Sequence, residues 1–140
     1  MKEETEALFV YGTLLSALPH HALVAPFVTA VEAATSEGRL YALPAGYPAL
    51  VPDPSGRVRG ELFWLRESDE CLRRLDAYED FDARDPERSL YIRERWVVRG
   101  DGGSRRGAWC YVWNPRRVAA LRRDAVEVPN GDWRAYAAGR

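Results

Sequence analysis

The chain has 140 residues, of which 46% are apolar and 29% are charged. Its formal net charge is −1, because it contains 20 basic and 21 acidic residues. This composition is typical of a folded globular protein, and the near-zero charge gives no bulk attraction to nucleic acid or an acidic membrane surface. The length predicts a single domain over residues 1–140, and the longest apolar stretch, Ala22–Val31, is interrupted by Pro26 and is too short to span a bilayer.

The first half of the chain alternates short apolar segments with breaks at glycine and proline. Residues 7–11 are apolar and stop at Gly12, which predicts a buried first strand. Residues 44–56 hold so many prolines and glycines that no regular element is expected there. The pattern further predicts a short helix over His20–Pro26 and strands over Thr29–Ala34, Arg39–Leu43 and Arg57–Leu65, the last with Leu62 and Phe63 on opposite faces.

Three helices are indicated later in the chain. A helix is predicted from Ser68 to about Glu79, because serine is a good cap and acidic residues follow it in the first turn. Asn114-Pro115 is typical of a helix start and predicts a helix through Arg123. A last short helix is expected over Asp132–Ala138.

Two further strands, Tyr91–Arg99 and Ala108–Trp113, flank residues 101–104, whose composition suits a hairpin connection. Strands therefore outnumber helices and cluster along the chain. We expect an α+β fold: a small mixed or antiparallel β-barrel with a few short helices packed on it.

Several common chemistries find no support in the sequence. It contains no phosphate-binding loop, no dinucleotide fingerprint and no serine-hydrolase elbow. His20 and His21 are neighbours that point in different directions, so we expect no metal site. Cys71 and Cys110 are interpreted as buried apolar residues, and together with the acidic start of the chain they favour a reduced, cytoplasmic setting.

The segment Tyr11-Gly12-Thr13-Leu14 directly follows the first predicted strand. A glycine at a strand end lets the backbone turn sharply and approach a ligand closely, and successive free amides there can bind an anion. The other interpretation is that Gly12 only makes a turn.

Glu79 lies at the end of the helix predicted to begin at Ser68. Positions 72, 75, 76 and 79 share one helical face, and Leu72 and Leu75 mark it as the inward face. Burial and the negative helix end would both raise the pKa of Glu79, as a carboxyl general base at neutral pH requires. Glu79 could instead be solvated at a frayed end, and Asp76 is a competing carboxylate that could hold a backbone or arginine partner structurally.

Taken in order, these segments resemble the gamma-glutamylcyclotransferase-like (avirulence-induced-gene-like) family. Tyr11–Leu14 resembles its Y-G-T-L signature, and Leu75–Glu79 resembles its L-D-x-[FY]-E segment, whose glutamate is the catalytic residue. The family often has glycine after that glutamate, whereas here a longer acidic segment, Asp80–Glu87, follows. Other matching segments extend the resemblance from about Leu8 to Tyr136: Gly46–Ala49, Val58–Phe63, Tyr91–Val98, Tyr111–Trp113 and Gly131–Tyr136.

The resemblance implies a cofactor-independent enzyme that cyclises a small-molecule gamma-glutamyl amide to 5-oxoproline and a free amine. It implies Glu79 as the catalytic residue and the Tyr11–Leu14 loop as the holder of the glutamyl group, with the backbone amides of the loop as donors. Tyr91 and Tyr111 are further candidates for the pocket wall. Arg93 and Arg95 could meet the substrate carboxylate, although solvated strand arginines are commoner.

Two other function classes stay open at this point. The acidic segment after Glu79 motivates a binding or regulatory module that holds a ligand without converting it. Aromatic and arginine residues could bind single-stranded nucleic acid, but the near-zero charge argues against that partner, as the apolar pattern does against a membrane. The leaving amine and the oligomeric state do not follow from the sequence.

Overall fold

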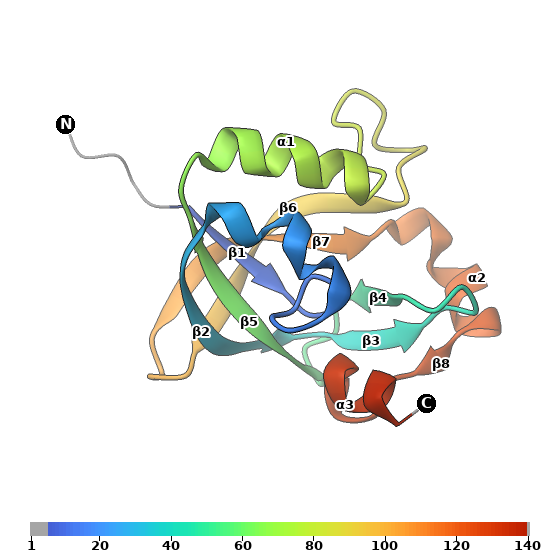
Figure 1. The fold of residues 1–140 in the computed structure, drawn as a ribbon. Coiled ribbons are helices and arrows are strands. Elements are labelled where there is room, and N and C mark those ends of the chain that lie inside the picture. The colour runs from blue at the N-terminus through green and yellow to red at the C-terminus, as the bar shows by residue number, and fades with distance from the viewer. Residues whose placement is uncertain (1–5, 140) are drawn as a thin grey trace.

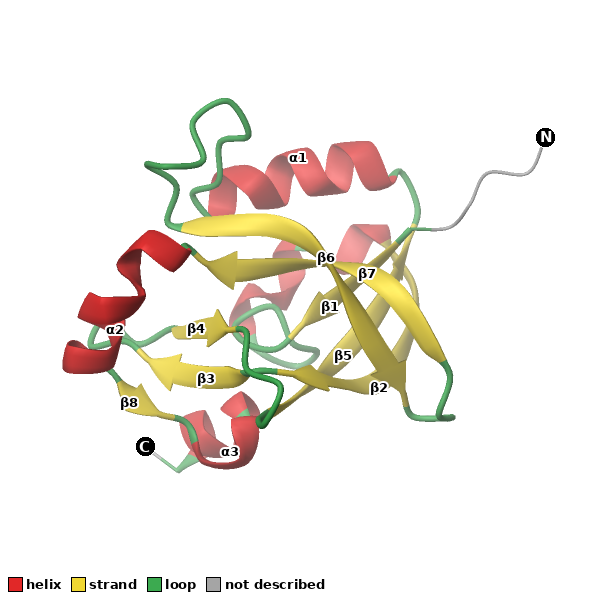
Figure 2. Cartoon of the chain, turned by 180° about the vertical axis from the view of Figure 1, so that it is seen from behind, coloured by secondary structure: helices red, strands yellow, loops and turns green. Residues whose placement is uncertain are grey.

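A computed structural model describes residues 6–139 (Figures 1 and 2). Residues 1–5, most of the acidic N-terminal segment, lie outside this range. Within it, a closed barrel forms from strands that pair in the order β1 (Ala7–Val10), β5 (Arg57–Leu65), β2 (Val28–Glu37), β6 (Tyr91–Gly100) and β7 (Arg105–Trp113). Neighbouring strands are antiparallel except at the seam, where β1 runs parallel to β7. The predicted α+β fold with a small mixed barrel is confirmed.

Strands β1 and β5 of the barrel are packed on both faces. Every residue of β1, Ala7–Val10, is buried, which explains its continuous apolar run. In β5, Leu62 and Phe63 are both buried although they point to opposite faces. The ring of His21 packs edge-on against Phe63, with 5.3 Å between the ring centroids. The outer side of β5 is therefore packed at this position and is not the solvated face that simple alternation suggests.

A smaller sheet lies beside the barrel (Figure 2), in which β3 (Arg39–Ala42) pairs with β4 (Pro48–Val51) on one side and β8 (Val126–Glu127) on the other. The prediction that residues 44–56 lack a regular element is wrong for β4. Pairing with β3 overrides the local signal, and Pro48 is tolerated because it is the first residue of an edge strand.

The helices of the described residues are short. Helix α1 lies over the barrel alongside β6 in both views (Figures 1 and 2). The predicted helix over His20–Pro26 is found as two 3-10 helices, each with a proline in its first turn. The bounds are α1 (Ser68–Tyr78), α2 (Val118–Asp124) and α3 (Trp133–Ala138), with 3-10 helices η1 (Pro19–Leu23), η2 (Ala25–Phe27), η3 (Pro115–Arg117) and η4 (Pro129–Gly131).

The helix caps differ in part from the prediction. Ser68 is the first residue of α1 and does not cap it; Glu67 precedes the helix in a left-handed conformation and makes no side-chain cap. Asn114 and Asp132 are caps, since their side chains each accept a backbone N–H bond of 3.1 Å at the start of a helix. Cys71 and Cys110 are both free and buried, as predicted.

Candidate active site

A cavity of about 390 Å³ is lined by the end of β1, the end of α1 and the start of β4. Among the described residues, its wall contains no lysine or arginine. Seven of the residues singled out from the sequence lie in this wall: Tyr11, Gly12, Thr13, Leu14, Glu79, Tyr91 and Tyr111.

The position of Glu79 is fixed by the way α1 ends. The N–H of Phe81 donates to the carbonyl oxygen of Asp76 at 2.8 Å, and the N–H of Asp80 donates to that of Ala77 at 3.3 Å. This pair of bonds is a Schellman motif, which places the residue after the helix cap in the left-handed conformation. Asp80 has this conformation, with φ 57°, and stands where the family often has glycine.

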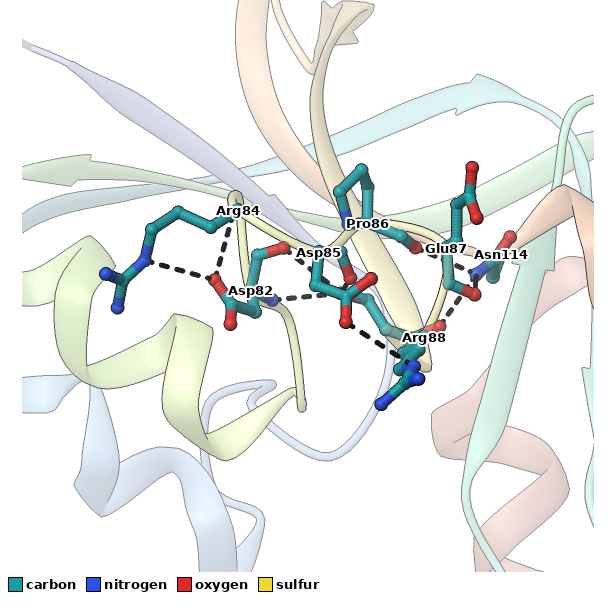
Figure 3. A network of polar contacts seen from close by, with 8 residues as sticks. Asp82, Arg84, Asp85, Pro86, Glu87, Arg88 and Asn114 are labelled. Carbon is teal, nitrogen blue, oxygen red and sulfur yellow. Dashed lines mark hydrogen bonds and ion pairs between the residues drawn. The ribbon is translucent and has the colours of Figure 1, made fainter.

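The acidic loop between α1 and β6 is held by hydrogen bonds within the loop and by others from Asn114, which follows β7 (Figure 3). The side-chain amide of Asn114 donates to the carbonyl oxygens of Pro86, Glu87 and Ser89, at 2.8–3.3 Å. The hydroxyl of Ser89 in turn accepts the N–H of Asp82 at 2.9 Å. The segment that departs from the family pattern is therefore an ordered loop, and it follows the Schellman motif that ends α1.

Replacing Asp80 tests the helix end. We expect Asp80→Gly to raise the free energy of unfolding by up to about 1 kcal/mol, because glycine adopts positive φ without steric cost. Asp80→Val is expected to lower it by about 1–2 kcal/mol, because β-branched residues disfavour that conformation. Urea unfolding of the two variants and the wild type measures both changes, and equal stabilities would contradict this account of the cap.

The carboxylate of Glu79 is partly buried and, within residues 6–139, neither accepts a hydrogen bond nor forms an ion pair. Burial raises the pKa of Glu79 to about 7. The negative end of α1 acts in the same direction. A carboxyl group with this pKa gains and loses a proton readily near neutral pH, as general acid and base catalysis requires.

The Tyr11–Leu14 loop offers hydrogen-bond donors to the cavity. The carbonyl oxygen of Gly12 accepts the N–H of Leu15 at 3.1 Å, so the backbone turns tightly here. The N–H groups of Thr13 and Leu14 donate no hydrogen bond within the described part of the chain. Two successive free amides in the wall of a cavity can hold a carboxylate or a developing oxyanion.

Contacts with the barrel and with α3 hold the next turn of this loop. The N–H of Ser16 donates to the carboxylate of Glu61 on β5 at 2.7 Å. Arg134 on α3 donates to the carbonyl oxygen of Ser16 at 2.7 Å and also lies 3.6 Å from the Glu61 carboxylate. The conformation of the loop therefore depends on a residue far along the chain.

A close contact explains why position 12 is glycine. A Cβ atom at Gly12 would lie 2.4 Å from the ring of Pro48. We expect Gly12→Ala to lower the free energy of unfolding by about 1–3 kcal/mol and to reduce turnover about 10²-fold by displacing the loop. Gly102→Ala is the matched control, because a Cβ there meets nothing within 4 Å. Equal unfolding curves and rates for the two variants would contradict the role of this contact.

Of the five tyrosines in the wall, Tyr11, Tyr91 and Tyr111 are buried, and each of these three donates its hydroxyl proton to the protein. Tyr11 donates to the carbonyl oxygen of Tyr111. Tyr91 donates to the carbonyl oxygen of Pro48 at 2.5 Å, and Tyr111 donates to the carboxylate of Asp76 at 2.7 Å. Burial raises the pKa of all three phenols well above the usual value, so they stay protonated.

Asp76 is engaged in a structural network. Its carboxylate accepts two bonds from the guanidinium of Arg93, at 2.7 and 3.2 Å, in addition to the bond from Tyr111. Arg95 pairs with Glu6 at 2.9 Å, and neither Arg93 nor Arg95 lines the cavity. The structural role considered for Asp76 is thus found, and the two arginines are not in a position to meet a bound carboxylate.

Several residues of the wall were not predicted from the sequence. The ring of His20 lies 5.8 Å from that of Tyr78, and the Tyr78 hydroxyl lies 3.0 Å from that of Thr13, so these side chains connect η1, α1 and the loop. Pro48 and Tyr47 enter the wall from the turn before β4. Tyr47 and Pro48 lie within the segment Gly46–Ala49 that resembles the family, and this match was the sequence signal that could have assigned them to the wall.

Residues 6–139 offer no metal-binding cluster and no membrane-spanning helix. Among residues 6–139, no three His, Cys, Asp or Glu side chains gather so that they could hold a metal ion. No helix in the same range has both the length and the apolar character needed to cross a membrane.

Comparison with known proteins gives several matches. The chain is 33% identical over 129 residues to the "Gamma-L-glutamyl-butirosin B gamma-glutamyl cyclotransferase" of Niallia circulans, covering 92% of this chain and 76% of that protein. The crystal structure of YkqA from Bacillus subtilis is similar with a TM-score of 0.69 and 27% identity, over 95% of this chain but only 41% of that one. An AIG2-like protein from Mus musculus shares the fold, with a TM-score of 0.63 and 22% identity over 83% of this chain and 84% of that one.

The family comparison covers nearly the whole chain. Residues 8–135 match the family described as "Gamma-glutamyl cyclotransferase, AIG2-like", a range that includes the complete wall of the cavity. Together with the N. circulans relative, this match supports gamma-glutamyl cyclotransferase activity in general. The chain belongs to the AIG2-like gamma-glutamyl cyclotransferase family.

Proposed function

We propose that this protein converts a gamma-glutamyl amide into 5-oxoproline and a free amine, with Glu79 as general base and general acid. The observation that carries the proposal is a carboxyl group with a pKa of about 7 and no partner within residues 6–139, in the wall of a cavity that also holds free backbone amides. The family of the chain and the activity named for its N. circulans relative point to the same chemistry.

The reaction is intramolecular, and water is not a reactant. The α-amine of the glutamyl group, freed of its extra proton, attacks its own γ-carbonyl carbon, which forms the ring C–N bond. Glu79 takes a proton from the attacking nitrogen and delivers it to the amide nitrogen as the original C–N bond breaks. Acid–base assistance of this kind contributes ~10²–10⁴-fold to the rate.

Backbone donors and the shape of the cavity supply the remaining contributions to the rate. The N–H groups of Thr13 and Leu14 are candidates to stabilise the oxyanion or to bind the α-carboxylate, because no lysine or arginine among the described residues lies in the wall. The rings of Tyr11, Tyr91 and Tyr111 enclose the glutamyl chain and favour its folded, near-ring conformation.

Mass spectrometry of 5-oxoproline tests the proposal. The purified protein is incubated with gamma-glutamyl derivatives of an aliphatic amine, an amino acid, a dipeptide and an aminoglycoside amine. We expect release of 5-oxoproline from at least one of them and none from α-glutamyl isomers, whose amine cannot close a five-membered ring on the amide carbonyl. Saturable binding of gamma-glutamyl derivatives without release from any of them would instead indicate a binding module and overturn the proposed activity.

A further inference from the structure

One arginine of the barrel contacts the chain on both sides of Glu79. The guanidinium of Arg93 donates two bonds to the carboxylate of Asp76, three residues before Glu79, at 2.7 and 3.2 Å. Its central carbon also lies 5.9 Å from the ring centroid of Phe81, two residues after Glu79. The Glu79 carboxylate has no hydrogen bond or ion pair of its own within residues 6–139, so its position depends on how the chain around it is held.

The barrel in turn fixes the position of Arg93. Its guanidinium lies over the ring of Trp109 on β7, 4.5 Å from the centroid. The side chains of Arg93 and Asp76 are only 19% and 20% exposed, and a two-bonded pair of this kind restricts orientation as well as distance. Tyr111, opposite Arg93 on β7, donates a further bond of 2.7 Å to the same carboxylate. Two adjacent strands therefore converge on one side chain of α1.

Asp76 also takes part in the end of the helix. Its carbonyl oxygen accepts the N–H of Phe81 at 2.8 Å, the longer bond in sequence of the Schellman motif. Asp76 and Phe81 are thus joined to each other through the backbone and to Arg93 through their side chains. Residues 77–80 form a closed turn between them, and Glu79, which belongs to this turn, lines the cavity.

We propose that Arg93 is a positioning residue for the reaction: by holding Asp76 and Phe81 it fixes the turn between them, and with it the carboxylate of Glu79, against the cavity. This inference rests on the proposed function and adds a residue outside the cavity wall on which turnover depends. A displacement of about 1 Å at a reacting group costs ~10²-fold in rate. Arg93 acts through Glu79 and does not itself meet the substrate.

The charges of Arg93 and Asp76 offset each other near Glu79, whose pKa is raised by burial. The other titratable groups beside Glu79 or in the cavity wall are Tyr11, His20, Tyr47, Tyr78, Asp80, Tyr91, Cys110 and Tyr111. Loss of Arg93 leaves the negative charge of Asp76 uncompensated and raises the pKa of Glu79, whereas loss of Asp76 leaves a positive charge and lowers it. The two halves of the pair therefore have opposite effects, which a structural role alone does not produce.

The titration of Glu79 is measured by NMR of ¹³C-labelled glutamate side chains, with Glu79→Gln identifying its signal, so no substrate is needed. We expect Arg93→Gln to raise the pKa of Glu79 by about one unit and Asp76→Asn to lower it by about one unit. The double variant, with both charges removed, is expected to return the pKa to the wild-type value. Shifts in the same direction in both single variants would overturn the inference.

Turnover of a gamma-glutamyl amide, measured at the optimum pH of each variant, separates position from charge. Arg93→Lys keeps the charge but loses the two-bonded geometry and the flat stacking. We expect it to lower kcat ~10–10²-fold with KM within about three-fold of the wild type and an unchanged pKa of Glu79. The double variant is expected to show the same loss of kcat. Wild-type kcat in Arg93→Lys, or in the double variant, would overturn the positioning role.

Arg95→Gln is the matched control. Arg95 lies on the same strand, stacks on the same ring of Trp109 at 4.4 Å and pairs with Glu6 at 2.9 Å, but within the described residues it forms no hydrogen bond or ion pair with α1. We expect its kcat to stay within a factor of about two of the wild type. An equal loss of kcat in Arg95→Gln and Arg93→Lys would overturn the inference. Thermal unfolding shows whether each variant is folded.

The two proposals can fail separately. A wild type that releases 5-oxoproline, with Arg93→Lys at wild-type kcat, would retain the proposed function and overturn the positioning role. A wild type that converts no gamma-glutamyl amide would overturn the function. Opposite titration shifts in Arg93→Gln and Asp76→Asn, with faster hydrogen exchange at the N–H of Phe81 in Arg93→Lys, would in that case still support Arg93 as the residue that holds Glu79.

Discussion

Glu79→Gln is expected to reduce the turnover of a gamma-glutamyl amide by ~10²–10⁴-fold while leaving the fold intact. Glutamine has nearly the same shape as glutamate and can still donate and accept hydrogen bonds, but it cannot take the proton of the attacking amine. Since no group within residues 6–139 pairs with the Glu79 carboxylate, the substitution removes no hydrogen bond or ion pair there. The measurement is 5-oxoproline release under single-turnover conditions, with circular dichroism as the check on folding.

The neighbouring carboxylate provides the control for this variant. Asp80→Asn removes one negative charge at the next position, outside the cavity wall, and asparagine tolerates the left-handed conformation that Asp80 adopts. We expect its turnover to stay within a factor of about two of the wild type. Wild-type turnover in Glu79→Gln, or an equal loss in both variants, would show that Glu79 does not transfer the proton.

The same substitution is expected to stabilise the protein at neutral and higher pH. The pKa of Glu79 rises from 4.5 to about 7 on folding because burial disfavours the charged form. The folded protein therefore holds this proton more tightly than the unfolded chain. As the pH rises from about 4.5 to about 7 the wild type loses stability, about 3 kcal/mol in all, and above pH 7 this loss is complete.

Urea unfolding of the wild type and Glu79→Gln between pH 4.5 and 8 measures this effect. The difference in unfolding free energy is expected to be near zero at the acidic end and about 3 kcal/mol in favour of the variant at pH 8. A difference that does not change with pH would mean that Glu79 is solvated in the folded protein.

Short-range patterns in the sequence predicted the parts of the site that depend on one element. The inward position of Glu79 follows from its spacing to Leu72 and Leu75 on a single helix, and both leucines are buried. The exposed amides after β1 follow from a glycine that ends a strand. Both inferences need only the periodicity of a helix or the freedom of one backbone position.

The parts that were missed depend on pairings between segments that the local pattern does not specify. Strand β4 exists because Leu50 pairs with Leu40, against the local signal of the prolines around it. The hydroxyls of Tyr11 and Tyr91 donate to the carbonyl oxygens of Tyr111 and Pro48, which are distant from them in sequence. No local pattern in the sequence specifies such partners.

The seam of the barrel also constrains when the site can form during synthesis. Strand β1, whose end carries the Tyr11–Leu14 loop, is translated first but pairs with β5 and then β7, so that Ala7 lies opposite Trp64 and Leu8 opposite Trp109. Contacts of such sequence separation make folding slow, commonly milliseconds to seconds. A nascent chain that has not yet released β7 from the ribosome therefore cannot close the barrel, and the cavity, whose wall includes Tyr111 on β7, is completed only after most of the chain has been made.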